Sequence, residues 1–210
     1  MHSRGFTFVE VLVVMTISAI LIAVAVPSFQ WTIARNRISD GTNQLLAHLE
    51  YARMESSRRG NSVSVCRSIN PNAPVGTLAC SSAATATTDG NDWATGWIVF
   101  EKVLPNIDES NFEAGDQLIF RQQAMGSGAG ARVMIHSSSP GAEFVSYQPR
   151  GAGGIIGGGQ TFTVDYGPVL TPISADRPIG SISLTNAARC IPITLLGSMR
   201  VARTSAGVCL

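Results

Sequence analysis

Few residues of this 210-residue sequence are of the types that carry acid–base, nucleophilic or metal chemistry. The three histidines, His2, His48 and His136, are far apart along the chain and suggest no catalytic triad. Neither of the glycine-rich runs, at 126–131 and 151–159, has the lysine of a phosphate-binding loop, and a predicted strand rather than a helix follows the first. We therefore expect no enzymatic activity, no metal site and no cofactor.

The four cysteines favour disulfide bonds over a metal site. Their number is even, no C-x-x-C pair occurs, and no histidine lies near them in the sequence. Four cysteines allow three pairings. All three stay open, but we favour Cys66 with Cys80 and Cys190 with Cys209 because each pair closes a local loop. Since disulfides persist in the periplasm and outside the cell, the cysteines also predict that this part of the protein lies in one of these two places.

Charged residues are scarce and unevenly placed. They make up 14% of the sequence with a net charge of +1, which excludes a polybasic nucleic-acid binder. Acidic residues gather at Asp89 and Asp92 and again over 108–116, but their spacing matches no calcium-binding loop. Residues 120–210 hold seven arginines against three acids. Three arginines near the last predicted strand could meet DNA phosphates, with solvated or ion-paired side chains as the alternative: Arg189, Arg200 and Arg203.

One acid stands inside a long apolar segment. Glu10 is the only formal charge between Phe6 and Phe29. Twenty-four helical residues reach about 36 Å, enough to span a hydrocarbon core of about 30 Å. The segment therefore predicts a membrane span over 6–29, in which the carboxylate of Glu10 needs a partner cation. A secretory signal peptide is the competing interpretation, but no small-x-small cleavage site follows the apolar run.

The rest of the chain divides into a helix and a strand-rich region. Side chains at spacings of three or four predict one face of an amphipathic helix over 30–59, with Gly60 as its stop. These are Trp31, Ala34, Ile38, Thr42, Leu45, Leu49 and Ala52. After Gly60, short strand-like runs alternate with turns, which predicts a head of antiparallel strands over 60–210. The runs cover 62–66, 96–100, 117–122, 131–137, 143–148, 161–166, 180–184 and 190–202.

The N-terminal segment Arg4-Gly5-Phe6-Thr7-Phe8-Val9-Glu10 resembles the signature of type IV pilins. The resemblance implies that residues 1–5 are a leader, that prepilin peptidase cuts between Gly5 and Phe6, and that the new amine of Phe6 is methylated. It also implies that Glu10 docks on the N-terminal amine of a neighbouring subunit, which suits a buried acid that needs a cation.

The run Asp92-Trp93-Ala94-Thr95-Gly96-Trp97, together with the helix end at 52–56 and the strand at 63–66, resembles the GspH/FimT family of minor pilins and pseudopilins. The resemblance implies an α+β type IV pilin fold, in which a long N-terminal helix packs on a β-sandwich-like head. We expect both tryptophans to belong to the core. The sequence Gly197-Ser198-Met199-Arg200 has Ser198 where DNA-binding FimT proteins carry the first of two arginines.

The resemblance predicts a structural subunit and not an enzyme. The expected function is that of a minor type IV pilin, which primes pilus assembly and sits in the tip complex with other minor pilins and the major pilin. Before assembly the chain would cross the inner membrane once with its head in the periplasm, and afterwards it would lie in the pilus on the cell surface. Two alternatives stay open: a DNA-binding pilin of natural transformation and a GspH-like pseudopilin of type II secretion.

Overall fold

The computed structural model divides the chain into two compact units, residues 1–36 and 37–210. A single helix, α1 (Phe8–Arg59), contributes to both units. The residues that the structure describes are 7–68, 70–81, 92–103, 108–125, 131–138, 144–149, 160–168, 188–195, 197–205 and 208–209.

The first unit consists of the N-terminal part of α1. The large apolar side chains described between Phe8 and Ile22 are 44–78% exposed. Over the described ranges, no helix combines the length and the apolar character needed to cross a membrane. The span predicted over 6–29 stays a prediction, and Phe6 lies outside the described residues.

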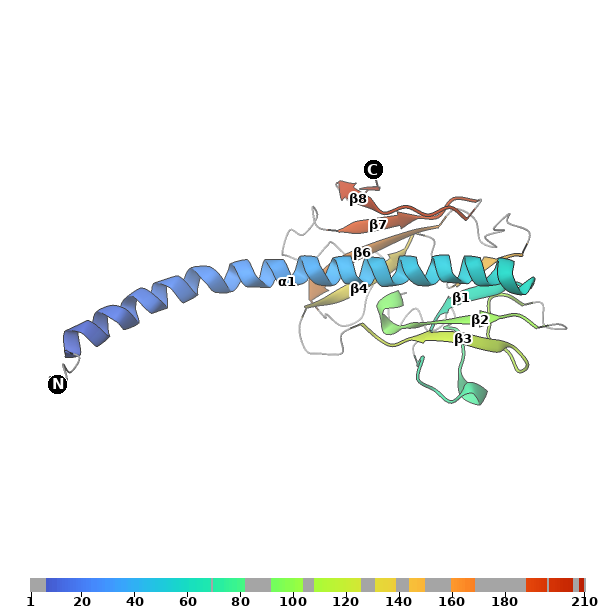
Figure 1. Cartoon of the computed structure of the whole chain (residues 1–210), viewed down its shortest axis with the longest axis horizontal. Coiled ribbons are helices and arrows are strands. Elements are labelled where there is room, and N and C mark those ends of the chain that lie inside the picture. The colour runs from blue at the N-terminus through green and yellow to red at the C-terminus, as the bar shows by residue number, and fades with distance from the viewer. Residues whose placement is uncertain are drawn as a thin grey trace, which may run out of the picture. The chain divides into compact units, whose positions relative to one another are not determined.

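In the second unit, α1 buries the predicted stripe. Ile38, Thr42, Leu45, Leu49 and Ala52 are at most 1% exposed, and their spacing of three or four residues places them on one face of the helix. The side chain of Trp31, the first residue of the predicted stripe, lies outside the described residues. The helix ends where predicted, because Gly60 adopts φ 73° and its N–H donates to the carbonyl of Ser56 at 3.0 Å. The head is a pair of antiparallel sheets, and Figure 1 shows β1 to β3 on one side of this part of α1 and β6 to β8 on the other.

The first sheet has four strands in the order β3-β2-β1-β5. One of its faces carries an apolar cluster that includes Cys66, Ile98, Phe100 and Phe112. The Cys66–Cys80 disulfide joins β1 to the segment that follows a short 3-10 turn, η1 (Val75–Thr77). The strand bounds are Val63–Arg67 for β1, Trp97–Glu101 for β2, Gln117–Gln122 for β3 and Phe144–Tyr147 for β5.

The second sheet has five strands in the order β4-β6-β7-β8-β9. The Cys190–Cys209 disulfide joins β7 to β9, so both bridges are the pairs that the sequence favours. The strand bounds are Ala131–Ser137 for β4, Thr161–Pro168 for β6, Arg189–Pro192 for β7, Ala202–Ser205 for β8 and Val208–Cys209 for β9.

Glycine at position 41 lets α1 approach the second sheet closely. A Cβ atom placed on Gly41 would lie 3.1 Å from Cγ1 of Val133 on β4 and 3.6 Å from Cγ1 of Val164 on β6. Because real Cβ atoms rarely come so close to another side chain, the missing side chain sets the distance between helix and sheet.

One predicted strand is wrong. The run 190–202 is not continuous, because β7 ends at Pro192 and a tight turn precedes β8. In that turn the N–H of Gly197 donates to the carbonyl of Thr194 at 2.8 Å, and Gly197 has φ 74°, a conformation that favours glycine. The predicted strand at 180–184 and the two glycine-rich runs, apart from Ala131, lie outside the described residues. The sandwich of antiparallel strands is confirmed.

Candidate functional site

The first turn of α1 holds the predicted docking residue, Glu10. Its backbone N–H donates to Oγ1 of Thr7 at 3.3 Å, and the N–H of Val11 donates to the Thr7 carbonyl at 3.3 Å. Thr7 therefore caps the helix start, and an acid in the first turn suits the positive end of the helix dipole. The side chain of Glu10 is exposed, so its carboxylate is accessible to another molecule. The predicted cleavage residues Gly5 and Phe6 lie outside the described residues.

Glu10 is surrounded in sequence by exposed apolar side chains. Val9 is 66% exposed, Leu12 47%, Val13 50% and Val14 58%. A monomeric soluble protein rarely exposes so long an apolar surface, and such surfaces mark contacts with proteins or membranes. The arrangement is an accessible carboxylate inside an apolar contact surface.

In the head, by contrast, Asp92 is fully buried and forms a joint that connects two elements through hydrogen bonds. One carboxylate oxygen, Oδ1, accepts hydrogen bonds from the N–H of Ala94 at 2.9 Å and from the N–H of Ile135 at 2.8 Å. The first bond caps a 3-10 turn, η2 (Trp93–Thr95), and the second reaches β4 of the second sheet. Of the acidic pair considered for calcium, Asp92 therefore has one carboxylate oxygen engaged by two backbone N–H groups, and Asp89 lies outside the described residues.

The same segment also contacts the first sheet. The carbonyl of Ala94 accepts from the N–H of Met125 just after β3, and the carbonyl of Gly96 accepts from the N–H of Ser68 just after β1, both at 2.8 Å. Gly96 has φ 125°, and a Cβ placed there would lie 2.6 Å from Cγ of Pro71 and 2.7 Å from the carbonyl oxygen of Gln122. Only glycine fits this position without strain.

The two tryptophans anchor this joint in the core, as the sequence predicts. Trp93 and Trp97 are 1% and 0% exposed, and the ring of Trp93 meets that of Phe162 edge-on at 4.8 Å. Nε1 of Trp97 donates to Nδ1 of His48 on α1 at 3.3 Å. The imidazole of His48 also lies 4.1 Å from the ring of Phe120, and its burial lowers the pKa of His48. His48 therefore packs against the core, with its Nδ1 occupied by the hydrogen bond from Trp97.

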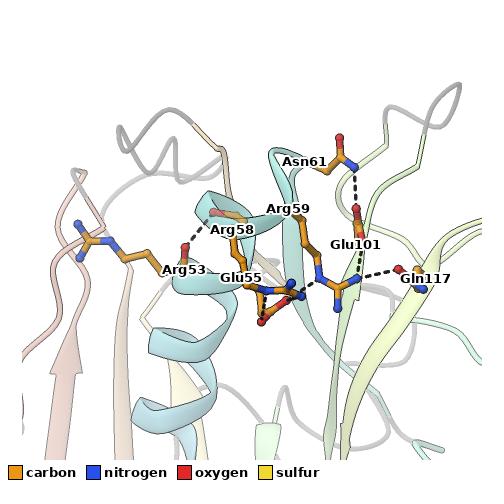
Figure 2. Close-up of polar contacts among 8 residues, drawn as sticks. Arg53, Glu55, Arg58, Arg59, Asn61, Glu101 and Gln117 are labelled. Carbon is orange, nitrogen blue, oxygen red and sulfur yellow. Dashed lines mark hydrogen bonds and ion pairs between the residues drawn. The ribbon is translucent and has the colours of Figure 1, made fainter.

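An ion-pair network closes the C-terminal end of α1 against the first sheet (Figure 2). The carboxylate of Glu55 accepts from Arg58 at 2.7 Å and from Arg59 at 2.5 Å. Arg59 also donates to Glu101 on β2 and to Gln117 on β3, each at 2.7 Å. The hydrogen bonds from the two arginines lower the pKa of Glu55 to about 2. The network holds the helix end to two strands.

The acidic residues at 108–116 are partly neutralised by a buried lysine. Nζ of Lys102 lies 2.7 Å from Oδ2 of Asp116 and 3.0 Å from Oε2 of Glu113. The lysine occupies the place that a cation would take between these carboxylates. Among the described residues, no group of histidine, cysteine and acid side chains could hold a metal ion.

The structure brings together two of the three arginines considered for DNA. Arg189 on β7 pairs directly with Arg203 on β8, so both side chains lie on the same face of the sheet. Arg200 is exposed and precedes β8, outside any strand. Whether any of the three contacts DNA stays a prediction.

The joint at Asp92 and the network at Glu55 were missed by sequence reasoning. The bond from Ile135 to Asp92 joins residues 43 positions apart, and no local pattern indicates such a contact. The network had a readable signal, because Glu55 precedes Arg58 and Arg59 by three and four residues, the spacing of helical ion pairs.

Comparison with known proteins adds two family matches. The family described as "Type II transport protein GspH" matches residues 41–198, and the "Prokaryotic N-terminal methylation motif" matches residues 1–26. The chain is also similar to two crystal structures of the type IV minor pilin FimU of Pseudomonas aeruginosa. One is 14% identical with a TM-score of 0.48 and covers 84% of this chain and 94% of FimU. The other is 13% identical with a TM-score of 0.45 and covers 78% and 90%. No curated protein matches the chain.

Proposed function

Because the chain belongs to the GspH family of pilin-like structural subunits, we propose that it acts as a minor pilin that enters a filament through the N-terminal part of α1. Proteins of this family are structural subunits rather than enzymes, and they assemble with other pilins. The single observation that carries the proposal is the exposed apolar helix around an accessible Glu10.

The physical argument starts from what this segment needs. Helix residues with 44–78% exposed apolar side chains are stable only when a membrane or other apolar helices cover them. A carboxylate in such surroundings needs a cation, and a processed neighbour would supply one as the amine of its Phe6. In the proposal, prepilin peptidase therefore cuts between Gly5 and Phe6, and the Phe6 amine is methylated. Glu10 then pairs with the Phe6 amine of a neighbouring subunit and so aligns the two subunits.

In this proposal the subunit lies first in the inner membrane and then in the pilus. Before assembly, residues 6–29 lie in the inner membrane and the head lies in the periplasm, where the two disulfides form. After assembly, the apolar helix is covered by the helices of other minor pilins and of the major pilin. We place the subunit in the complex that primes assembly and sits at the pilus tip, a role that the N-terminal and Asp92–Trp97 resemblances support.

The test is the intact mass and N-terminus of the protein in sheared surface filaments and in membranes of the same cells. The expected species begins at N-methylated Phe6, lacks four hydrogens because of two disulfides, and occurs in filaments at trace level. Glu10→Ala should be processed normally but reach filaments poorly, whereas Glu50→Ala, which removes an exposed acid of the head part of α1, should assemble normally. Retention of Met1 in both fractions, or full incorporation of Glu10→Ala, would refute the proposal.

A second candidate function is supported by the printed description of the family, which names type II transport. In that case the subunit belongs to a periplasmic pseudopilus that helps to secrete folded proteins. Deleting the gene separates the two candidates. Loss of surface pili with normal secretion favours the pilus, and loss of secreted enzymes with normal pili favours the pseudopilus.

A further inference from the structure

The single lysine of the sequence lies where β2 and β3 meet. Lys102 directly follows β2, and Asp116 directly precedes β3. The two strands pair as far as Glu101 and Gln117, so the next residue on each strand stands beside the other. Nζ of Lys102 lies 2.7 Å from Oδ2 of Asp116 and 3.0 Å from Oε2 of Glu113. One amine therefore contacts two carboxylates.

The contact between Lys102 and Asp116 is enclosed by protein. The side chain of Lys102 is 4% exposed and that of Asp116 is 0% exposed, whereas that of Glu113 is 39% exposed. The ring centre of Phe100 lies 5.5 Å from Nζ, and this ring meets that of Phe112 edge-on at 5.3 Å. A fixed contact from which water is excluded favours a reaction between the two groups, because they need not find each other by diffusion.

Backbone donors are aimed at the carboxyl group of Asp116. The N–H of Glu113 donates to Oδ2 at 2.8 Å, and the N–H of Val103 donates to Oδ1 at 3.4 Å. Such donors stabilise the negative charge that develops on oxygen when a nucleophile attacks the carboxyl carbon. The carboxylate of Glu113 accepts a hydrogen bond from Nζ of Lys102, within the distance at which a general base takes a proton.

We propose that Lys102 and Asp116 form an amide bond between their side chains, with Glu113 as the catalytic base. One proton first passes from the ammonium to the carboxylate of Asp116, which removes two charges that burial makes costly. The neutral amine then attacks Cγ of Asp116, while Glu113 takes a second proton from Nζ and gives it to the hydroxyl group that leaves as water. One N–C bond forms, one C–O bond breaks and one water is released, so the step needs no oxidant or other reactant.

The residue type at position 102 favours an amide over a permanent ion pair. Arginine accounts for the other 14 of the 15 basic residues, and it binds a carboxylate through two parallel hydrogen bonds while staying charged. An ion pair alone is formed equally well by arginine, as the contacts of Glu55 with Arg58 and Arg59 show. Lysine is the basic residue whose amine can lose its proton and be acylated.

The bond would give the first sheet a covalent link besides the Cys66–Cys80 disulfide. It ties the end of β2 to the start of β3 and closes a ring over residues 102–116. A reductant that opens the disulfides leaves an amide intact. The inference goes beyond the proposed function and concerns the head alone, because a subunit can enter a filament with or without this bond.

The experiment compares the intact mass of the reduced full chain with the mass calculated from its sequence and observed N-terminus. We expect the parent chain to be lighter by one water. Trypsin should leave the chain uncut after Lys102, because an acylated lysine is not its substrate, and fragmentation of the peptide 68–121 should locate the link between Lys102 and Asp116. Lys102→Arg keeps the charge but should show the calculated mass. Asp116→Asn should lose ammonia instead of water and so yield the same product as the parent.

A further pair of variants tests the base. Glu113→Gln should slow the reaction about a hundredfold, measured as the fraction of chain that lacks one water at set times after protein synthesis is stopped. Asp108→Asn alters an exposed acid of the same segment and is the matched control, which should react at the rate of the parent.

Three results would overturn the bond: the calculated mass in the parent chain, cleavage after Lys102 in a chain that is lighter by one water, or the same loss of water in Lys102→Arg. A parent rate in Glu113→Gln would refute the role of the base. The melting temperature of each variant shows whether the head is folded. If Lys102→Arg unfolds, Asp116→Asn supplies the test, since only a link through this side chain predicts the loss of ammonia.

Discussion

The two parts of α1 differ in how their apolar side chains are arranged around the helix and in what can cover them. Between Phe8 and Ile22 nearly every residue is apolar and the described apolar side chains are exposed, whereas from Ile38 to Ala52 the buried apolar residues form one stripe. A stripe is covered by a single surface, which the head of the same chain supplies. A helix that is apolar all round needs cover on every side, and a single head cannot supply it. The spacing of the apolar residues therefore separates contacts within the subunit from contacts with its surroundings.

The acids in the two parts differ in the same way. Glu55 is buried and accepts hydrogen bonds from two arginines of its own helix. Glu10 is exposed, and its carboxylate lies among apolar side chains. The acid of the head is neutralised within the chain, and the acid of the N-terminal part is available to a cation from another chain.

The largest expected effect comes from replacing a leucine by alanine in the head part of α1, compared with the same replacement in the N-terminal part. Leu45→Ala removes a fully buried side chain and should lower the free energy of unfolding of the head by about 2–5 kcal/mol. Leu12→Ala alters a side chain that is 47% exposed and should leave the stability of the head unchanged. Urea unfolding followed by tryptophan fluorescence checks both. Equal losses in the two variants would break the comparison.

A second pair of variants tests the joint between the sheets. Gly96→Ala places a Cβ within 2.7 Å of two neighbouring atoms at φ 125°. Backbone strain alone costs about 1–3 kcal/mol, and because the close contacts add to it, the head should lose more stability than that. Gly60→Ala meets no atom within 4 Å and should show only the cost of its left-handed conformation, about 1–2 kcal/mol. Thermal melting of the two variants gives the difference, and a loss for Gly96→Ala no larger than that for Gly60→Ala would show that the close approach to Pro71 is not restrictive.

The contact between His48 and Trp97 gives a smaller, pH-dependent effect. Burial lowers the pKa of His48, so its contribution to stability is present above the unfolded value of 6.5 and is lost as pH falls below it. His48→Phe keeps an aromatic ring against Phe120 but removes the acceptor for Trp97, which should cost about 1 kcal/mol at neutral pH. The variant should also flatten the decline in stability below pH 6.5. An unchanged decline would assign it to another group.

The smallest expected effect concerns the end of α1. Because the pKa of Glu55 is lowered to about 2 from 4.5, its ion pairs contribute stability that is present above pH 4.5 and lost as pH falls through about 2. Glu55→Gln should therefore be less stable than the parent at neutral pH and should lose less stability over that acid range. Glu50→Gln, on the exposed side of the same helix, is the matched control and should follow the parent curve. Acid unfolding followed by circular dichroism measures all three.

The sequence could predict the elements whose pattern is local. The stop of α1 at Gly60 and the bounds of β3 and β4 agree with the spacing of apolar residues and turn residues. The prediction for 190–202 was wrong because it gave too little weight to Gly197, whose left-handed conformation reverses the chain. The role of Asp92 could not be predicted, since its partner on β4 is brought near only by the packing of the sheets.

The close approach at Gly41 has a mechanical consequence. Sliding α1 along its axis by one turn, about 5.4 Å, would bring Ile38 or Leu45 to the place where even a Cβ atom has only 3.1 Å of room beside Val133. The close approach at Gly41 therefore prevents α1 from sliding along its axis against the second sheet. In the proposed filament, a pull along α1 would therefore load the contact of Gly41 with Val133 and Val164 in shear, because the helix cannot slide past the two strands.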